Sequence, residues 1–342
     1  MRTKASLFSI FTLLPIPKVG KEGEAFSAQV IAQSSYQVGK DTEGRPAILI
    51  AISNTTKIVE TSYPVALEHI SVRYNVLCEI TKVSSASRQG RFIVIRCESH
   101  ENDLVEYFLR IMEVHIPLLG ETPSYKQVVD MVEKLIELFR ALSQPNKQSI
   151  QGLWAELLII SESADPILLL RSWHFSPDDR YDFFFEKKYI EVKSTSGSAR
   201  IHHFSLEQLN PPTGTTALVV SLFVERSVDG VTVIDLMDRI RTQIKGDVSL
   251  LAHLHRNVTL TLASDWRLAA SLKFDQRLAK KSLCIYDVDD IPSVDWPVPL
   301  DVSEVKFKAN LSRTAPRDAA SLETADGLFA AIAKIATTPA RV

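Results

Sequence analysis

Residues 180–195, RYDFFFEKKYIEVKST, place charged side chains among aromatic and aliphatic ones. Residues two apart on a strand point to the same face, so Glu191 and Lys193 project together. A tight turn around EKK brings Asp182, on the preceding strand, close to the Glu191 end of its neighbour. The pattern predicts two carboxylates and one ammonium group on one face of a hairpin, a cluster that apolar surroundings tolerate when the charges are paired or bind a metal ion.

The chemistry that suits such a cluster is metal-assisted phosphodiester hydrolysis. Two neighbouring carboxylates offer hard oxygen ligands to Mg²⁺, which keeps some of its waters and takes other ligands from phosphate. The metal lowers the pKa of a bound water and polarises the phosphoryl oxygen. Lys193 can orient or help deprotonate that water and balance developing charge. The main-chain carbonyl of Val192 offers a further ligand, and we expect Mn²⁺ to substitute for Mg²⁺.

The elements that must position these residues fall into two predicted domains, residues 1–145 and 146–342. Length alone favours about two domains. In the first, β-branched and alternating segments predict strands at 45–53, 69–80 and 90–99, followed by two helices. Residues 143–149, SQPNKQS, read as a linker. The second domain reads as α/β, with a helix at 150–163, the hairpin, a short strand near 200–204, a helix at SLEQL, a strand at 215–226 and a helix at 235–245.

Asp182 followed by EVK at 191–193 resembles the D-x(n)-E-x-K signature of the PD-(D/E)XK nuclease superfamily. The wider segment, about 148–235, resembles a bacterial PD-(D/E)XK family found among restriction and phage-defence genes. The resemblance implies that Glu156, in GLWAELLII, is the acid of the first helix and assists the metal. It also implies that Gln208 is a polar helix residue near the scissile phosphate. Tyr181 stands where the superfamily name expects Pro, whereas a literal Pro-Asp occurs at 177–178, so Asp178 is the alternative first acid.

The net charge limits how this protein could bind nucleic acid. A net charge of −2 argues against a surface that is basic throughout, but it allows a local basic patch. Residues 237–281 carry an excess of Lys and Arg over Asp and Glu. A solvated helix face is the alternative explanation. The remaining histidines, His174 among them, show no metal-ligand spacing. The candidate nucleic-acid contacts are Arg180, Ser194, Thr195, His202, Arg239, Arg241 and Lys245.

The residue patterns predict an α/β chain preceded by a β-rich α+β domain for target recognition or partner binding, and the resemblance implies a restriction-endonuclease-like core with a mixed central sheet flanked by helices. The resemblance also implies the activity of a Mg²⁺-dependent, type II restriction-like endodeoxyribonuclease acting on double-stranded DNA, in restriction or phage defence. A homodimer is expected because cutting both strands takes two sites. We further expect a cytoplasmic location, no membrane segment, and a methyltransferase or helicase-like ATPase encoded nearby. The alternatives are an inactive nuclease-fold subunit that binds DNA or assembles a complex, and a structural protein whose charges form only salt bridges.

Overall fold

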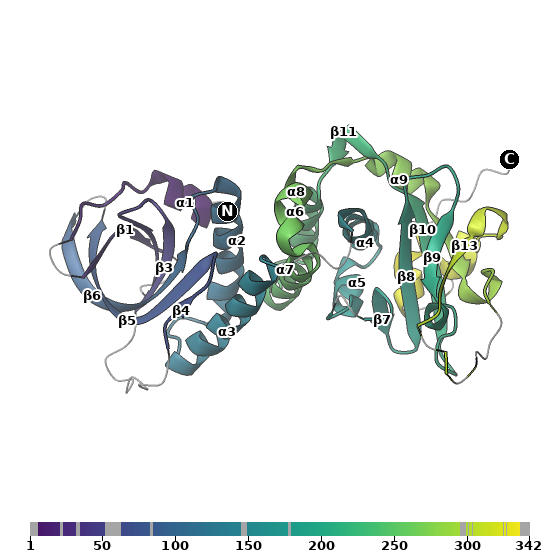
Figure 1. Ribbon diagram of the computed structural model, residues 1–342, viewed down its shortest axis with the longest axis horizontal. Helices are drawn as coiled ribbons and strands as arrows, with labels where there is room; N and C mark the ends of the chain where they lie inside the picture. Colours follow the sequence, from purple (N-terminus) through teal and green to yellow (C-terminus); the bar gives the residue numbers. More distant parts are fainter. Residues whose placement is uncertain are drawn as a thin grey trace. The chain divides into compact units, whose positions relative to one another are not determined.

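A computed structural model describes most of the chain, which divides into two compact units, Met1–Gln144 and Pro145–Val342 (Figure 1). Each unit has its own hydrophobic core. The described residues are 6–20, 23–31, 35–51, 63–82, 85–144, 149–176, 179–294, 299, 301–302, 304–323, 325 and 327–335.

The first unit is built on a sheet that closes on itself. Strand order is β1-β2-β3-β6-β5-β4, and β1 also pairs with β5 in parallel, which joins the two ends of a five-stranded ring. The inward residues of these strands are apolar and buried, as period-2 alternation requires. The elements are α1 (Leu7–Leu13), β1 (Glu24–Val30), β2 (Tyr36–Asp41), β3 (Pro46–Ala51), β4 (Val65–Ala66), β5 (Ile70–Lys82) and β6 (Ser85–Cys97).

Two amphipathic helices complete this unit, α2 (Asn102–Leu118) and α3 (Tyr125–Ala141). The start of α3 is fixed by a capping box, in which the side chain of Ser124 accepts the N–H of Gln127 and the Gln127 side chain accepts the N–H of Ser124. Phe108 and Phe139 meet edge to face, with their ring centroids 6.1 Å apart, and join the two apolar faces.

The second unit contains a four-stranded mixed sheet in the order β12-β10-β8-β7. β8 and β10 are parallel, whereas β7 and β12 run antiparallel to their neighbours. β9 pairs with β13 in a separate two-stranded sheet. The strands are β7 (Phe183–Phe185), β8 (Lys188–Thr195), β9 (Ile201–Ser205), β10 (Thr216–Phe223), β11 (Arg226–Val231), β12 (Cys284–Asp287) and β13 (Lys306–Asn310).

Helices cover this sheet, and α4 carries the charged residue Glu156 into the core. It contacts β8 and, through another face, α6 (Figure 1). Ser149 caps its N-terminus by accepting the N–H of Gly152, and every residue from Leu153 to Ser161 is buried. The helices are α4 (Ile150–Glu162), α5 (Pro166–Ser172), α6 (Val233–Gln243), α7 (Val248–Leu262), α8 (Trp266–Ser271), α9 (Gln276–Ser282), α10 (Ala319–Glu323) and α11 (Gly327–Ala333).

Three elements of the second unit differ from the sequence predictions, and in the first unit the strand predicted at 90–99 begins earlier, at Ser85. SLEQL forms only a single 3₁₀ turn, η1 (Leu206–Gln208), because Asn210 and two prolines follow it. The strand expected at 215–226 is wrong as one element, since β10 ends at Phe223 and β11 begins at Arg226. The helix expected at 235–245 begins earlier, at Val233, where Thr232 and Asp235 form a capping box.

Candidate metal centre

Asp182 lies immediately before β7, and its side chain forms a hydrogen bond with the neighbouring strand, β8. Phe183, the next residue, pairs with Ile190 of β8. The Asp182 Oδ2 atom accepts a hydrogen bond from the backbone N–H of Val192 at 2.6 Å. The N–H and C=O of a strand residue point toward the same edge, so the Val192 carbonyl faces the same side as Asp182.

Glu191 and Lys193 lie two apart on β8 and form an ion pair, with Lys193 Nζ 2.6 Å from Glu191 Oε1. Gln208, from η1, contacts both. Its Nε2 donates to Glu191 Oε1 at 2.7 Å and to the Arg180 carbonyl at 3.0 Å. Its Oε1 accepts from Lys193 Nζ at 3.3 Å. The side chain of Gln208 therefore fixes the orientation of the Glu191–Lys193 pair.

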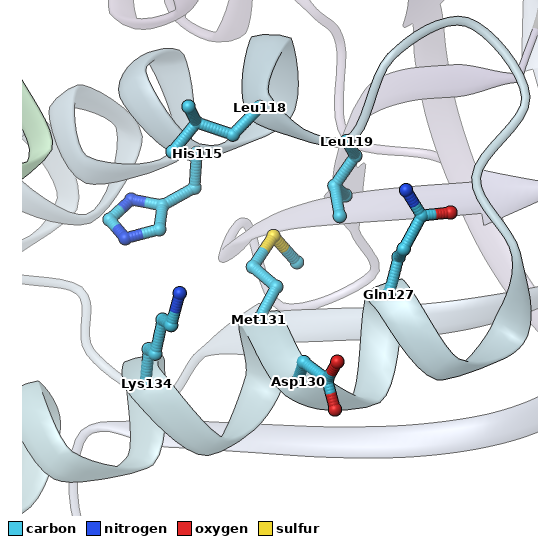
Figure 2. A pocket seen from close by; sticks show the side chains of 7 residues that line it. All are labelled: His115, Leu118, Leu119, Gln127, Asp130, Met131 and Lys134. Atoms are coloured by element: carbon cyan, nitrogen blue, oxygen red, sulfur yellow. The ribbon is translucent and has the colours of Figure 1, made fainter. Parts of the chain in front are cut away.

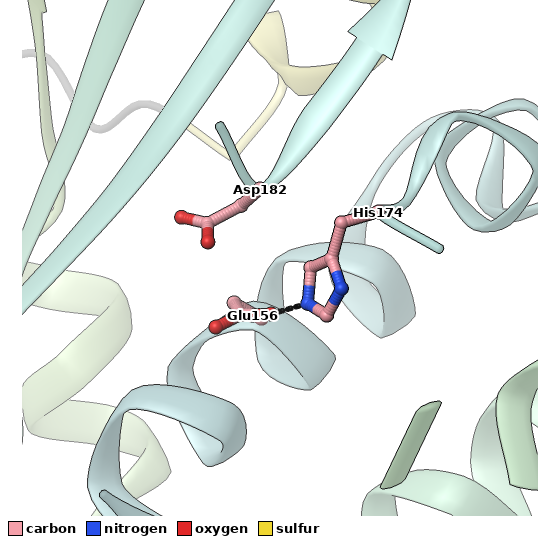
Figure 3. Close-up of side chains that lie close together, drawn as sticks. All are labelled: Glu156, His174 and Asp182. Atoms are coloured by element: carbon pink, nitrogen blue, oxygen red, sulfur yellow. Dashed lines mark hydrogen bonds and ion pairs between the residues drawn. The ribbon is translucent and has the colours of Figure 1, made fainter. Parts of the chain in front are cut away.

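Glu156 enters the same region from the middle of α4. Its Oε2 accepts a hydrogen bond from Trp173 Nε1 at 2.7 Å and lies 3.2 Å from His174 Nε2. Ligand atoms of Glu156, His174 and Asp182 all lie within 4.8 Å of one another (Figure 3). The structure thus brings a helix, the segment between α5 and β7, and a hairpin together around one cluster of donors.

Burial and like charges act together on the titration of this cluster. Glu156, Asp182 and Glu191 are only 3 %, 9 % and 4 % exposed. Burial raises the pKa of Asp182 well above its ordinary value of 3.8, and the Glu191 and Glu156 carboxylates raise it further. Burial also raises the pKa of Glu191, although the nearby Lys193 opposes the rise. A cluster that resists full ionisation in this way is suited to an added cation.

Burial acts on the pKa of Lys193 in the opposite direction from its action on the carboxylates. Burial alone lowers the pKa of its ammonium group, but attraction to Glu191 and the hydrogen bond between the two outweigh that effect. The net result is a pKa above the ordinary 10.5, with smaller contributions from Asp182 and Glu156. Lys193 is therefore a cation at neutral pH.

The donors present fit a divalent cation. Glu191 Oε2 is buried and has no hydrogen-bond partner among the described residues, which leaves a carboxylate oxygen free to bind an ion. Carboxylate oxygens are the ligands that Mg²⁺ and Mn²⁺ prefer. Sequence reasoning assigned no metal role to His174, because its proximity to Glu156 arises only from the packing of α5 against α4.

The other residues predicted to contact nucleic acid lie on several separate elements. Ser194 Oγ accepts from Gln151 Nε2 at 3.1 Å, and Thr195 Oγ1 accepts the N–H of Gly197 at 3.3 Å. Arg180 is exposed. His202 is buried, with Nε2 2.7 Å from Ser221 Oγ, so a direct phosphate contact by His202 is not available in this arrangement.

The basic residues of α6 and the turn that follows it form a group of their own. Arg239 Nη1 bonds Gln276 Oε1 at 2.9 Å and lies 3.8 Å from Glu162. Arg241 and Lys245 are exposed. None of these three is among the residues that contact Asp182 or Glu191 in the described structure. Asp178, the alternative first acid, lies outside the described residues.

A cavity of about 200 Å³ lies in the first unit, between α2 and α3 (Figure 2). Burial lowers the pKa of His115, which leaves this lining residue neutral at pH 7. The charges of Asp130 and Lys134 balance, so the lining favours neither anions nor cations. The lining residues are His115, Leu118, Leu119, Gln127, Asp130, Met131 and Lys134.

Across the described residues, no helix has both the length and the apolar character needed to cross a membrane. This finding concerns the helices alone.

Comparison with known proteins agrees with the geometry. Residues 9–312 match the model of the family described as "Putative PD-(D/E)XK family member" (DUF4420). Searches of curated proteins and of solved structures found no match. The matched segment includes the helix of Glu156, the hairpin of Asp182, Glu191 and Lys193, and the turn of Gln208. The chain therefore belongs to this PD-(D/E)XK family.

Proposed function

We propose that this chain is a divalent-metal-dependent endonuclease that hydrolyses phosphodiester bonds of double-stranded DNA, with Mg²⁺ as its cofactor and Mn²⁺ as a substitute. The observation that carries the proposal is the charge balance of the buried cluster. Three carboxylates, from Glu156, Asp182 and Glu191, lie around one ammonium group, from Lys193. With all three carboxylates ionised, as cation binding would leave them, the two negative charges left over equal the charge that one divalent cation neutralises.

A purely structural salt bridge accounts for this cluster less well. Lys193 is paired with Glu191, which leaves Asp182 with a backbone N–H as its hydrogen-bond donor. Burying unpaired like charges is costly, and apolar residues at these positions would be cheaper for stability. The cost is explained if the cluster serves binding, because functional sites commonly retain such unfavourable charge.

Each residue has a role in the proposed hydrolysis. A bound divalent cation supplies Lewis-acid polarisation of the phosphoryl oxygen and lowers the pKa of a coordinated water. Asp182 and Glu191 would hold the cation, with the Val192 carbonyl and Glu156 as further ligands. The Lys193 ammonium group orients the attacking water and stabilises negative charge that develops on the phosphoryl oxygens. Gln208 holds Glu191 and Lys193 in register for these tasks.

A plasmid-cleavage assay tests the proposal. Wild type is incubated with supercoiled DNA and Mg²⁺ or Mn²⁺, beside Lys193→Ala and the matched control Lys187→Ala, an exposed lysine in the turn of the same hairpin. We expect cleavage by wild type and by the control, and a loss of about 100-fold or more in Lys193→Ala. Equal nicking by wild type and Lys193→Ala would refute the assigned role, and wild type without cleavage would favour an inactive DNA-binding subunit.

The biological setting proposed for this activity is restriction or phage defence, in the cytoplasm, with a homodimer supplying one site for each strand. Family membership supports the nuclease fold on which this setting depends. Analytical ultracentrifugation with and without duplex DNA would test the dimer.

A further inference from the structure

His174 is a candidate ligand that lies outside the acid-acid-lysine pattern. Its side chain is buried, and its Nε2 atom lies 3.2 Å from Glu156 Oε2 (Figure 3). We propose that His174 binds the cation of this site through Nε2, which makes the centre a mixed nitrogen and oxygen site and accounts for the ability of Mn²⁺ to substitute for Mg²⁺. This inference rests on the proposed function and specifies the metal chemistry of the same site.

The spacing of the donor atoms supports a shared ion. Two ligands at neighbouring corners of an octahedron, each about 2.1 Å from the metal, lie about 3.0 Å apart. The 3.2 Å separation between His174 Nε2 and Glu156 Oε2 is close to that value. Opposite corners lie about 4.2 Å apart, and the donors of Glu156, His174 and Asp182 all fall within 4.8 Å of one another. One ion can therefore contact all three with small side-chain adjustments.

The backbone on either side of the imidazole holds it in place. The N–H of His174 donates to the Asp182 carbonyl at 2.9 Å, which ties the proposed ligand directly to the first motif acid. The His174 carbonyl accepts a hydrogen bond from Asn257 Nδ2 of α7. Trp173 Nε1 donates to Glu156 Oε2 and orients that carboxylate. Partners that orient metal ligands in this way commonly raise metal affinity.

A second observation points to a cation bound near Asp182. Glu191 is 4 % exposed, and its Oε2 atom has no hydrogen-bond partner among the described residues. A buried carboxylate oxygen without a donor requires either a proton or a cation nearby.

An imidazole ligand changes which metal is favoured. Oxygen-only sites suit Mg²⁺, whereas imidazole nitrogen favours transition metals, and Mn²⁺ accepts both carboxylate and imidazole ligands. Removing His174 should therefore weaken Mn²⁺ binding more than Mg²⁺ binding. A role for His174 limited to hydrogen bonding with Glu156 predicts similar changes for the two ions.

Electron spin echo spectroscopy of bound Mn²⁺ in the full-length protein tests this directly, because a coordinated imidazole produces nitrogen modulation. The variants are His174→Asn and the matched control His253→Asn, whose Nε2 lies 3.3 Å from the Trp173 carbonyl and which is not in the donor group. We expect nitrogen modulation in wild type and in the control, and its loss in His174→Asn. Competition titrations should show Mn²⁺ affinity falling 10-fold or more, with Mg²⁺ affinity falling less.

The outcomes separate this inference from the proposed function. Mn²⁺ binding that depends on Asp182 but shows no nitrogen modulation would overturn the role of His174 and leave the nuclease proposal in place. If no binding depends on Asp182, both proposals fail. Should His174→Asn not fold by circular dichroism, wild type labelled with ¹⁵N-histidine still decides the question, because the modulation frequency must change with the isotope if an imidazole is bound.

Discussion

Replacing Asp182 by Asn removes one charge from the buried cluster but keeps an oxygen that can accept the Val192 N–H. The charge is costly, because burial and the Glu191 and Glu156 carboxylates all raise the Asp182 pKa. We therefore expect Asp182→Asn to be more stable than wild type in EDTA at neutral pH and to lose stabilisation by divalent cations. A mutation that stabilises the protein while abolishing its activity is the expected behaviour of a functional acid.

The size of the stability gain expected for Asp182→Asn follows from the distance between the Asp182 and Glu156 carboxylates. Ligand atoms of Glu156 and Asp182 lie within 4.8 Å of each other. Two unit charges at that distance repel by roughly 3 kcal/mol at an effective dielectric constant of about 20. Because the raised pKa of Asp182 lets a proton offset part of this repulsion, the expected gain is about 1–2 kcal/mol, or about 3–6 °C in the melting temperature of a domain of this size. A cation at about 100 times its Kd should stabilise wild type by about 2.7 kcal/mol.

The direction of the Asp182 pKa shift fixes how the stability of the protein changes with pH. The folded-state pKa of Asp182 is higher than its ordinary value of 3.8, so the folded protein keeps a proton that the unfolded chain has released. The stability that this group contributes is fully present below that ordinary value and is lost as the pH rises through the folded-state pKa. Asp182→Asn should lose this component, and the stability gain of the variant should therefore grow with pH.

Thermal melts followed by circular dichroism, in EDTA and then in Mg²⁺ or Mn²⁺, measure these effects. Asp229→Asn is the control, because Asp229 is an exposed carboxylate on β11. That variant should melt like wild type with and without the ions. The reasoning is wrong if Asp182→Asn melts lower than wild type in EDTA, or if it keeps the full shift on addition of cations.

Two further predictions concern residues beside the cluster. Gln208→Ala removes the hydrogen bonds to Glu191 and Lys193, and we expect a loss of about 10- to 100-fold in cleavage or metal affinity. The control, Glu207→Ala of the same turn, should change little. Equal cleavage rates for Gln208→Ala and wild type would show that Gln208 has no role in the site. Burial, and to a smaller extent Lys193 and Arg200, lower the pKa of His202 to about 4. The contribution of neutral His202 to the free energy of unfolding is therefore complete above pH 6.5 and is lost as the pH falls toward 4. Urea unfolding at pH 7 and pH 4 should show wild type losing roughly 3 kcal/mol more stability than His202→Asn, and equal losses would contradict the shift.

Local patterns along the chain are sufficient to predict much of the hairpin. Alternation on β8 places Glu191 and Lys193 on one face, and the turn returns the chain so that Asp182 meets the same strand. The PD-(D/E)XK family, predicted from a resemblance over the same segment, is confirmed by the family match, and the mixed sheet with its helices agrees with the predicted α/β character. The prediction of the hairpin succeeds because strand periodicity and turn geometry depend on neighbouring residues alone.

Tertiary structure decides the rest. His174 joins Glu156 and Asp182 only because α5 and the following residues pack against α4 and β7. His202, expected near phosphate, instead bonds Ser221 inside the core, since its neighbours along the strand do not reveal which face β9 buries. Contacts between separate elements depend on how whole apolar faces pack together, and no local period encodes that packing. The sequence by itself determines which residues can carry charge to the site, and the fold determines which donors surround it.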